Sequence, residues 1–396
     1  MTRLIAYMPN PSGLTGAPRR LLSLASVLND EGIRVCIATQ SSSELIQTAD
    51  ANNHETDPID AVGVLALRQR ALFGSDPLFR LRVFIDLLRQ NWQLLRCIRR
   101  KNGDVVWIRG SKGIAFGALG TFLSRRPLIW DVDYELPSRG IVRWLHQFGI
   151  WASKVIVFQY SEAPKEIFGR EVASRFRKKI RVIIPGVEIS ILESYREKRK
   201  QREKPKNDPF VILQVGTICD RKNQKVLIEA LINIKKAEPS RKVEIWFAGR
   251  VFEKEHAEAL QDLIDENGLS KLVSFLGWRE DVHDLMVRAD LLVMPSRDEG
   301  VPNTVQEAMA IGLPVAVSQA GGMPEVVADR DTGWVLEVDN ASAWAKRIIW
   351  CLNHPTECEA VGHRGCAYAL EHFGTEQWGK EYGHVVKDAV GKGDGR

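Results

Sequence analysis

Two carboxylates stand on either side of a tight turn in the stretch SRDEGVPNTVQEAMAIGLPVAV. Glu299 lies in a loop that turns through Gly300 and Pro302, and Glu307 follows eight positions after Glu299 in a helix-like segment. An ionised carboxylate can accept two hydrogen bonds at once, which suits the paired hydroxyls of a sugar. The spacing therefore favours a ligand that presents a polyol at each end.

Two adjacent cations, Arg221 and Lys222, follow the apolar segment FVILQV and its Gly216, just before a helical segment that starts at Asn223. Cations beside a helix N-terminus, at the carboxyl end of a strand, form a good site for a diphosphate. Positive charge at this end opposes the helix dipole, so some compensation is expected. Phosphate binding is the favoured interpretation, and a pair of solvated charges is the alternative.

The helix after the Glu299 loop is expected to start between Pro302 and Thr304, because proline suits the first helical turn. Its first backbone N–H groups, near Thr304 and Val305, would then be available to an anion. Thr304 and Glu307 also fit a capping box, in which Glu307 would bind the N–H of the cap residue. Glu299 has no helix to cap, and its alternative is a solvated loop acid.

Both halves of the 396-residue chain alternate short apolar segments with helical segments. The strand-like segments are LIAYMP, IRVCIAT, DVVWIRG, PLIWDVD and KVIVFQ in the first half, and FVILQVG, VEIWFAG, LVSFLG, DLLVMPS and LPVAVS in the second. This alternation predicts an α/β fold with two doubly wound parallel sheets. Such sheets bind ligands outside the carboxyl ends of their strands, which is where the cations and Glu299 are found.

The expected domain limits follow from composition. A first domain covers 1–190, a charged connector without hydrophobic period covers 191–209, and a second domain covers 210–375. Residues 376–396 are expected to form a final helix and a disordered tail.

Hydrophobic residues make up 44% of the chain and charged residues 27%, which is typical of globular proteins. The net charge of +5 is uneven, because residues 1–190 carry +10 and residues 208–396 carry −9. The first half is therefore expected to meet an anionic partner, with a solvated Arg-rich surface as the alternative. No signal peptide or transmembrane run is visible, and the six cysteines lack zinc spacing, so a cytosolic protein without a metal is predicted.

The segment PLFRLRVFIDLLRQNWQLLRCIRRK is amphipathic and rich in arginine. Its apolar residues are Leu81, Phe84, Ile85, Leu88, Trp92 and Leu95. VRWLHQFGIWASK has a similar pattern, with Trp144, Leu145, Phe148 and Trp151. Either stripe could touch anionic lipid as a basic amphipathic helix, or it could pack on the sheet.

The segment PSRDEGVPNTVQEAMAIGLPVAVSQAGGMPEVV resembles the donor site of glycosyltransferase family 4. VGTICDRKNQ resembles the phosphate loop of that family, and FAGR, with Gly249, and HFGTEQWGKEYGHVV also follow the family's order. The resemblance covers about 210–385. It implies the GT-B fold, in which two Rossmann-like doubly wound domains face each other across a cleft. It also implies that the final helix returns to the first domain.

The resemblance implies transfer of a hexose from a UDP- or GDP-linked donor to a glycan or lipid-linked acceptor, with retention of anomeric configuration. Lys222 and Arg221 would stabilise the departing diphosphate. Glu299 would hold the donor hexose, and Glu307 would hold the ribose. No metal, other cofactor or nucleic acid is expected. The implied donor-binding set is Gly16, Gly216, Lys222, Gly249, Gly300, Val301, Pro302, Asn303, Thr304, Val305 and Glu307.

Two positions depart from the family pattern. Thr217 stands where the family often has arginine, and Asp133 stands where it often has a histidine near the reaction centre. Asp133 could orient an acceptor hydroxyl or act as a base, or it could merely cap a loop. The expected setting is polysaccharide or glycolipid assembly in the cytoplasm, at the inner face of a membrane. The alternatives are a nucleotide-sugar epimerase on the same fold and a non-catalytic nucleotide-sugar-binding subunit.

Overall fold

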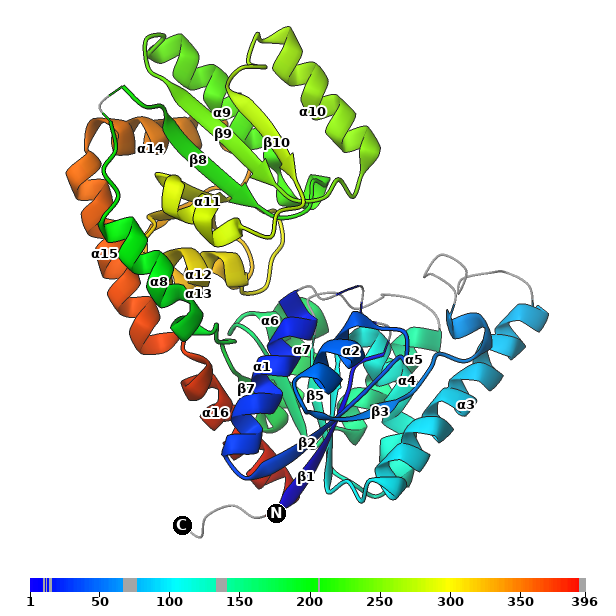
Figure 1. Cartoon of the computed structure of the whole chain (residues 1–396). Helices are drawn as coiled ribbons and strands as arrows, with labels where there is room; N and C mark the ends of the chain where they lie inside the picture. Colours follow the sequence, from blue (N-terminus) through cyan, green and yellow to red (C-terminus); the bar gives the residue numbers. More distant parts are fainter. Residues whose placement is uncertain are drawn as a thin grey trace. The chain divides into compact units, whose positions relative to one another are not determined.

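The computed structural model describes residues 1–9, 11, 13, 16–66, 77–132, 141–205 and 207–391. The chain divides into two compact units, each built on one parallel sheet with flanking helices (Figure 1). Unit 1 comprises Met1–Pro185 and Thr375–Arg396, and unit 2 comprises Gly186–Gly374. The α/β class with two doubly wound parallel sheets is confirmed. None of the helices in these described ranges is long and apolar enough to cross a membrane.

Unit 1 contains a seven-stranded sheet in the order β3-β2-β1-β4-β5-β6-β7. The strand bounds are β1 (Thr2–Tyr7), β2 (Ile33–Thr39), β3 (Glu55–Pro58), β4 (Val105–Arg109), β5 (Leu128–Asp131), β6 (Val155–Phe158) and β7 (Ile180–Val182). All pairings are parallel, with Leu4 opposite Val105 between β1 and β4. The strand order reverses between β1 and β4, so the ligand-binding edge expected for this fold lies there.

The helices of unit 1 cover both faces of this sheet (Figure 1). They are α1 (Gly16–Asp30), α2 (Glu44–Ala51), α3 (Pro77–Arg100), α4 (Gly110–Leu123), α5 (Ile141–Ala152), α6 (Ala163–Phe168), α7 (Arg170–Arg175) and α16 (Thr375–Val390), with short 3-10 turns at Gly63–Ala66 and Arg177–Lys179. Helix α4 packs against both α3 and α5, and α16 packs against α1.

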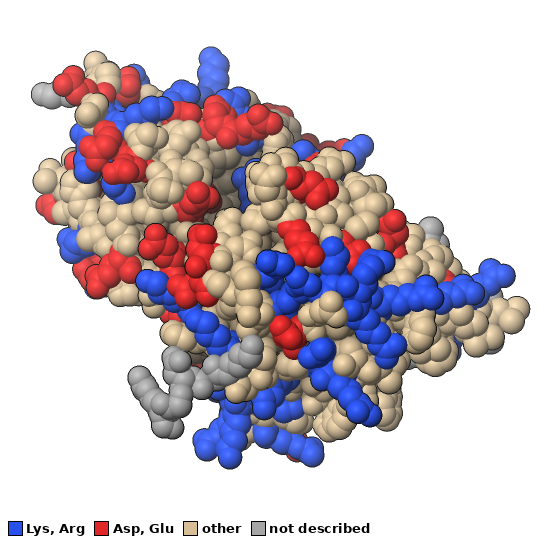
Figure 2. All heavy atoms as spheres, turned by 60° about the horizontal axis from the view of Figure 1, so that its bottom comes forward, with Lys and Arg blue, Asp and Glu red and all other residues tan. Residues whose placement is uncertain are grey.

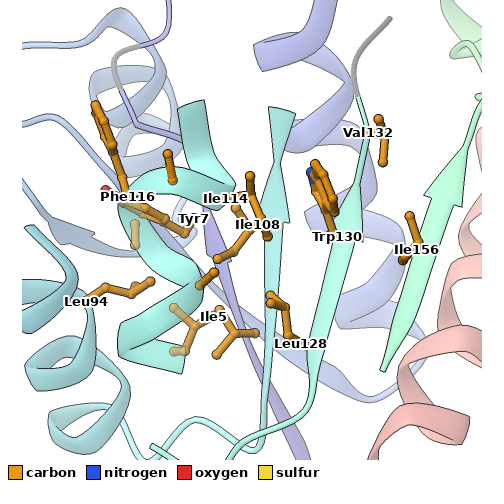
Figure 3. Close-up of a cluster of buried hydrophobic side chains, with 14 of the residues drawn as sticks. Ile5, Tyr7, Leu94, Ile108, Ile114, Phe116, Leu128, Trp130, Val132 and Ile156 are labelled. Carbon is orange, nitrogen blue, oxygen red and sulfur yellow. The ribbon is translucent and has the colours of Figure 1, made fainter. Parts of the chain in front are cut away.

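The core of unit 1 is apolar and consists of two clusters of buried side chains, one of which is drawn in Figure 3. Ile5, Ile108 and Trp130 are fully buried, as expected for strands covered on both faces. The last helix adds one buried polar contact, because the Tyr382 hydroxyl donates to Asp131 Oδ2 at 2.6 Å. Burial, helped by the charge of Asp131, raises the pKa of Tyr382 well above its usual value, so the phenol stays protonated.

Unit 2 contains a six-stranded sheet in the order β10-β9-β8-β11-β12-β13. Its strands are β8 (Phe210–Val215), β9 (Val243–Ala248), β10 (Val273–Gly277), β11 (Leu291–Met294), β12 (Val315–Ser318) and β13 (Trp334–Leu336). Its helices are α8 (Ile189–Lys200), α9 (Gln224–Ala237), α10 (Lys254–Glu266), α11 (Val282–Arg288), α12 (Asn303–Ile311), α13 (Met323–Val326), α14 (Ala341–Asn353) and α15 (Pro355–His372), with a 3-10 turn η4 at Asp220–Lys222.

The connector expected at 191–209 is wrong for its first half. Residues 189–200 form α8, which belongs to unit 2 and packs against α11 and α12. Arg199 holds α8 in place, because its guanidinium donates to the carbonyl oxygens of Gly312 at 3.1 Å and Ala289 at 2.8 Å. The charged sequence hid the helix because a partly buried arginine, rather than an apolar stripe, supplies much of its attachment.

The two stretches that carry the candidate functional residues Lys222 and Glu299 meet at one point of the unit 2 sheet. Strand β8 pairs in parallel with β11, with Ile212 opposite Leu291. The strand order reverses between these two strands. Their loops, which carry Lys222 and Glu299, therefore leave the same edge at the switch point, where open α/β sheets bind ligands.

Candidate functional site

Lys222, Arg221 and Glu299 form a compact ionic cluster at the carboxyl ends of β8 and β11. The Lys222 Nζ lies 2.6 Å from Glu299 Oε2, and the Arg221 Nη1 lies 3.1 Å from the same oxygen. Arg221 also donates to the backbone carbonyl oxygen of Asp298 at 2.8 Å. The side chains of Lys222 and Glu299 are only 10% and 14% exposed, so the two solvated-charge alternatives are wrong for them.

The cluster carries one more positive charge than negative charge. Burial raises the pKa of Glu299, but the charges of Lys222 and Arg221 outweigh this effect and leave the pKa below its ordinary value. Glu299 is therefore ionised near neutral pH. A site with two cations and one carboxylate still favours an incoming anion, and low exposure to water strengthens that preference.

The lowered pKa of Glu299 predicts how the stability of the fold depends on pH. A carboxylate whose pKa is lowered in the folded state stabilises the fold at pH values above its unfolded-state pKa, here about 4.5. This contribution is lost as the pH falls through the folded-state pKa. Glu299→Gln is therefore expected to melt below wild type at pH 7, with the gap closing below about pH 4. Thermal melting from pH 7 to pH 3 measures it. The matched control is Glu258→Gln, which changes an exposed glutamate. A difference in melting temperature between wild type and Glu299→Gln that is the same at every pH would contradict the prediction.

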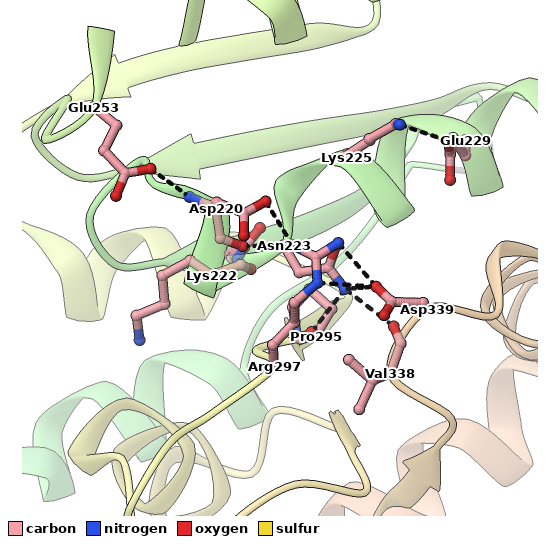
Figure 4. Close-up of polar contacts among 11 residues, drawn as sticks. Asp220, Lys222, Asn223, Lys225, Glu229, Glu253, Pro295, Arg297, Val338 and Asp339 are labelled. Atoms are coloured by element: carbon pink, nitrogen blue, oxygen red, sulfur yellow. Dashed lines mark hydrogen bonds and ion pairs between the residues drawn. The ribbon is translucent and has the colours of Figure 1, made fainter. Parts of the chain in front are cut away.

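A buried amide fixes the loop that carries the two cations (Figure 4). Asn223 is fully buried and adopts a left-handed conformation with φ of 54°. Its Nδ2 donates to the carbonyl oxygens of Pro295 at 3.1 Å and Val338 at 3.0 Å, which ties the β8 loop to the loops after β11 and β13. Arg297 adds to the connection, bonding the Asp220 carbonyl oxygen at 2.7 Å and pairing with Asp339 at 2.9 Å. The side chain of Lys222 points away from this network (Figure 4).

Two glycines allow the backbones around the cluster to approach each other closely. A Cβ at Gly249 would overlap the carbonyl oxygen of Gly216, and a Cβ at Gly321 would overlap that of Glu299. Gly321 also has a φ of +55°, which side chains rarely adopt. The next residue, Gly322, donates its N–H to the Glu299 carbonyl oxygen at 3.2 Å. The loop that holds Glu299 is therefore set by backbone contacts that only glycine permits.

Glu307 lies in the middle of α12 and does not form the capping box. The N-cap of α12 is Pro302, which has no side-chain cap hydrogen bond, and Glu307 Oε2 lies 3.3 Å from His283 Nε2 of α11. The capping-box alternative is therefore wrong. The sequence predicts that the Val305 N–H is available to phosphate. In this conformation it instead donates to the Pro302 carbonyl oxygen at 3.1 Å.

The remaining site predictions fall in different places. Gly300, Val301 and Pro302 line the buried turn between Glu299 and α12, and Asn303 and Thr304 begin that helix. Gly16 is the exposed first residue of α1 in unit 1. Asp133 lies outside the described residues. Thr217, which replaces the usual arginine, is exposed, and the Arg221 guanidinium lies at the cluster instead.

Sequence reasoning missed several residues that build the site. Asn223, Arg297 and Asp339 act through hydrogen bonds to loops 42 to 116 positions away, which no local pattern reveals. His283 could have been noticed only by placing α11 beside α12. Gly321 was not missed, because the adjacent glycines in SQAGGMPE predict close backbone approach, and the structure confirms this at Gly321.

Comparisons with known proteins agree with this geometry. Residues 195–366 match the family model described as glycosyl transferases group 1. The putative glycosyltransferase EpsD of Bacillus subtilis is 32% identical over 44% of this chain and 45% of its own length. The chain spans about half the length of the first curated relatives, because the matched part covers 45% to 51% of each relative. An Escherichia coli UDP-Gal:alpha-D-GlcNAc-diphosphoundecaprenol alpha-1,3-galactosyltransferase is 25% identical over 65% of this chain and 68% of its own length.

The fold itself is shared with solved structures over nearly the whole chain. Anabaena HepE in complex with UDP superposes with a TM-score of 0.78 at 18% identity, covering 98% of this chain and 100% of HepE. Identity at this level shows the fold alone. The GT-B fold expected from the sequence is confirmed, and the family-model match is compatible with family 4, which stays a prediction.

Proposed function

We propose that this chain is a retaining hexosyltransferase. The proposal starts from two findings: residues 195–366 match the model of the group 1 glycosyl transferases, and the chain has the GT-B fold. Its donor is a UDP- or GDP-linked sugar. Its acceptor is a glycan or a lipid-linked glycan used in cell-surface polysaccharide or glycolipid assembly. The relatives support this class, because one is described as acting on a diphosphoundecaprenol-linked sugar and one structural neighbour holds UDP.

The observation that carries the proposal is the ionic cluster at the β8–β11 switch point. When the glycosidic bond of a nucleotide sugar breaks, negative charge develops on the diphosphate. Lys222 and Arg221 are already oriented toward one point and need little rearrangement to stabilise that charge. The reaction as we propose it needs no metal, because these two side chains supply the positive charge that the leaving group requires.

Glu299 has a second role in this proposal. In the unliganded cluster it neutralises part of the positive charge and holds both cations in place. When a diphosphate binds, the cations gain a stronger anionic partner and the carboxylate becomes available to accept hydrogen bonds from hexose hydroxyls. Glu307 would hold the ribose hydroxyls in the same way, exchanging its contact with His283 for the donor.

Binding of the free nucleoside diphosphate tests this proposal directly. UDP, GDP and ADP are added separately, with EDTA present throughout, and the melting temperature is measured. One nucleotide is expected to raise it by several degrees, because a ligand that binds only the folded state stabilises it by mass action. Glu307→Gln should remove most of the shift, whereas Glu357→Gln, an exposed glutamate on α15, should keep it. No shift with any nucleotide would contradict the proposal.

A further inference from the structure

Helix α3 turns large apolar side chains toward solvent. Its exposed members, with relative exposure, are Leu78 (71%), Leu81 (54%), Phe84 (47%), Ile85 (38%), Leu88 (42%) and Trp92 (51%). The opposite side of the same helix is buried against unit 1 through Val83, Leu87 and Leu94. The stripe predicted from the sequence is therefore not packed on the sheet, apart from Leu95, which is 2% exposed. Helix α3 has two apolar sides, and only one of them packs into the core.

Helix α4 continues this surface. Gly120 N–H donates to Asn91 Oδ1 at 2.9 Å, and a Cβ on Gly117 would lie 2.7 Å from Leu94. Both helices run from the carboxyl edge of the parallel sheet to its amino edge, and they meet at a point next to Trp92 on α3 and one turn before Leu123 on α4. Phe122 and Leu123 are 46% and 52% exposed at this end of α4.

Helix α5 extends the surface further. The Phe122 ring lies 5.4 Å from the Trp151 ring and 5.7 Å from the Phe148 ring, measured between centroids. Trp151 is 57% exposed, and Trp144, two turns earlier on the same side of α5, is 75% exposed. Nine large apolar side chains thus lie on one exposed surface made by α3, α4 and α5, which we term the apolar face: Leu81, Phe84, Ile85, Leu88, Trp92, Phe122, Leu123, Trp144 and Trp151. Exposed apolar surface of this extent marks an interaction site.

The apolar face is bordered by positive charge. Helices α3, α4 and α5 contain eight Lys and Arg residues and one acid, Asp86, which is buried. Arg82, Arg89 and Arg96 are exposed and follow one border of the α3 stripe at helical spacing, and Arg96 lies 5.8 Å from the Trp92 ring. Figure 2 shows Lys and Arg side chains gathered on one part of the surface with few acidic side chains among them.

We propose that the apolar face of unit 1 is a docking surface for the headgroup region of an anionic lipid bilayer. Trp, Phe and Leu side chains would enter the boundary between headgroups and acyl chains, and the bordering arginines would bind lipid phosphates. A second copy of the chain fits the surface less well, because two copies meeting through it would oppose their own excess positive charge. The inference goes beyond the proposed reaction, because binding to a bilayer requires no donor.

Co-sedimentation of the full chain with vesicles tests the docking surface. Vesicles of phosphatidylcholine alone are compared with vesicles containing phosphatidylglycerol, at low and high salt. The wild-type chain is expected to sediment with the anionic vesicles at low salt, and less at high salt. Leu88→Ser combined with Trp92→Ser should weaken binding roughly tenfold or more. Arg82→Gln combined with Arg96→Gln should weaken it and reduce the salt dependence.

The matched control is Trp278→Ser in unit 2, because Trp278 is 50% exposed and also has an arginine, Arg250, over its ring. Its vesicle binding should equal that of wild type, and all variants should keep their melting temperature. The proposal is overturned if wild type ignores anionic vesicles, or if the double variants bind as wild type does. It is also overturned if wild type is a dimer in solution that Leu88→Ser with Trp92→Ser converts to a monomer without any vesicle binding.

Discussion

Replacing Lys222 with methionine is expected to lower the rate of nucleoside diphosphate release from the nucleotide sugar by about 10²- to 10³-fold. The Lys222 Nζ is the closest cation to Glu299 and is among the least exposed charges of the described chain. Methionine is one atom shorter than lysine but keeps an unbranched chain of similar volume, so the main loss is the charge. Initial rates at saturating donor measure the effect.

A neighbouring lysine supplies the control for this experiment. Lys225 lies three positions later, is 58% exposed and forms an ion pair with Glu229 at 3.7 Å. Lys225→Met removes the same charge from the same part of the chain, yet its rate should stay within twofold of wild type. If both variants retain full activity, the cluster does not stabilise the leaving group and the proposed role of Lys222 is wrong.

Replacing Gly321 with alanine should have the largest effect on stability and should also remove donor binding. A Cβ at Gly321 would overlap the carbonyl oxygen of Glu299. The Cβ position is fixed by the backbone of residue 321, and the oxygen is itself a backbone atom, so no side-chain rotation can relieve the overlap. The loop that holds Glu299 must therefore move. We expect the free energy of unfolding to fall by about 3 kcal/mol or more, which corresponds to roughly 10 °C in the melting temperature of a unit of this size.

Gly268 separates steric overlap from backbone strain. Its φ of +65° is close to the +55° of Gly321, but a Cβ at Gly268 meets nothing within 4 Å. Gly268→Ala therefore costs only the left-handed conformation, about 1–2 kcal/mol, and should keep nucleotide binding. Equal losses of melting temperature in the two variants would show that the contact between Gly321 and the Glu299 loop does not set the geometry of the site.

The fold was predictable because its signals are local. Alternating apolar and helical segments indicate parallel sheets without knowledge of any contact, and both sheets have that form. The ionic cluster was only partly predictable. Lys222 and Glu299 are 77 positions apart, and their meeting depends on β8 lying beside β11, which the sequence alone does not state.

Two elements show where pattern reasoning reaches its limit. Helix α8 has little apolar periodicity, so its attachment through the partly buried Arg199 could not be foreseen. Helix α3 has the opposite difficulty, because Leu88 and Trp92 on one side and Leu87 and Leu94 on the other are equally apolar. Periodicity finds both stripes but cannot tell which one faces the core, since that depends on where α4 and the sheet lie.

The fate of a labelled donor sugar tests the central claim most directly. The full chain is incubated with UDP- or GDP-hexose radiolabelled in the sugar, together with a lipid extract as acceptor, and label is followed into the lipid or glycan fraction. The account predicts acceptor-dependent transfer of label, with one nucleoside diphosphate released for each sugar transferred, and loss of both in Lys222→Met. Release of free or epimerised sugar without an acceptor would instead indicate an epimerase. Binding of the donor without any turnover would indicate a non-catalytic subunit, and either result would contradict the account.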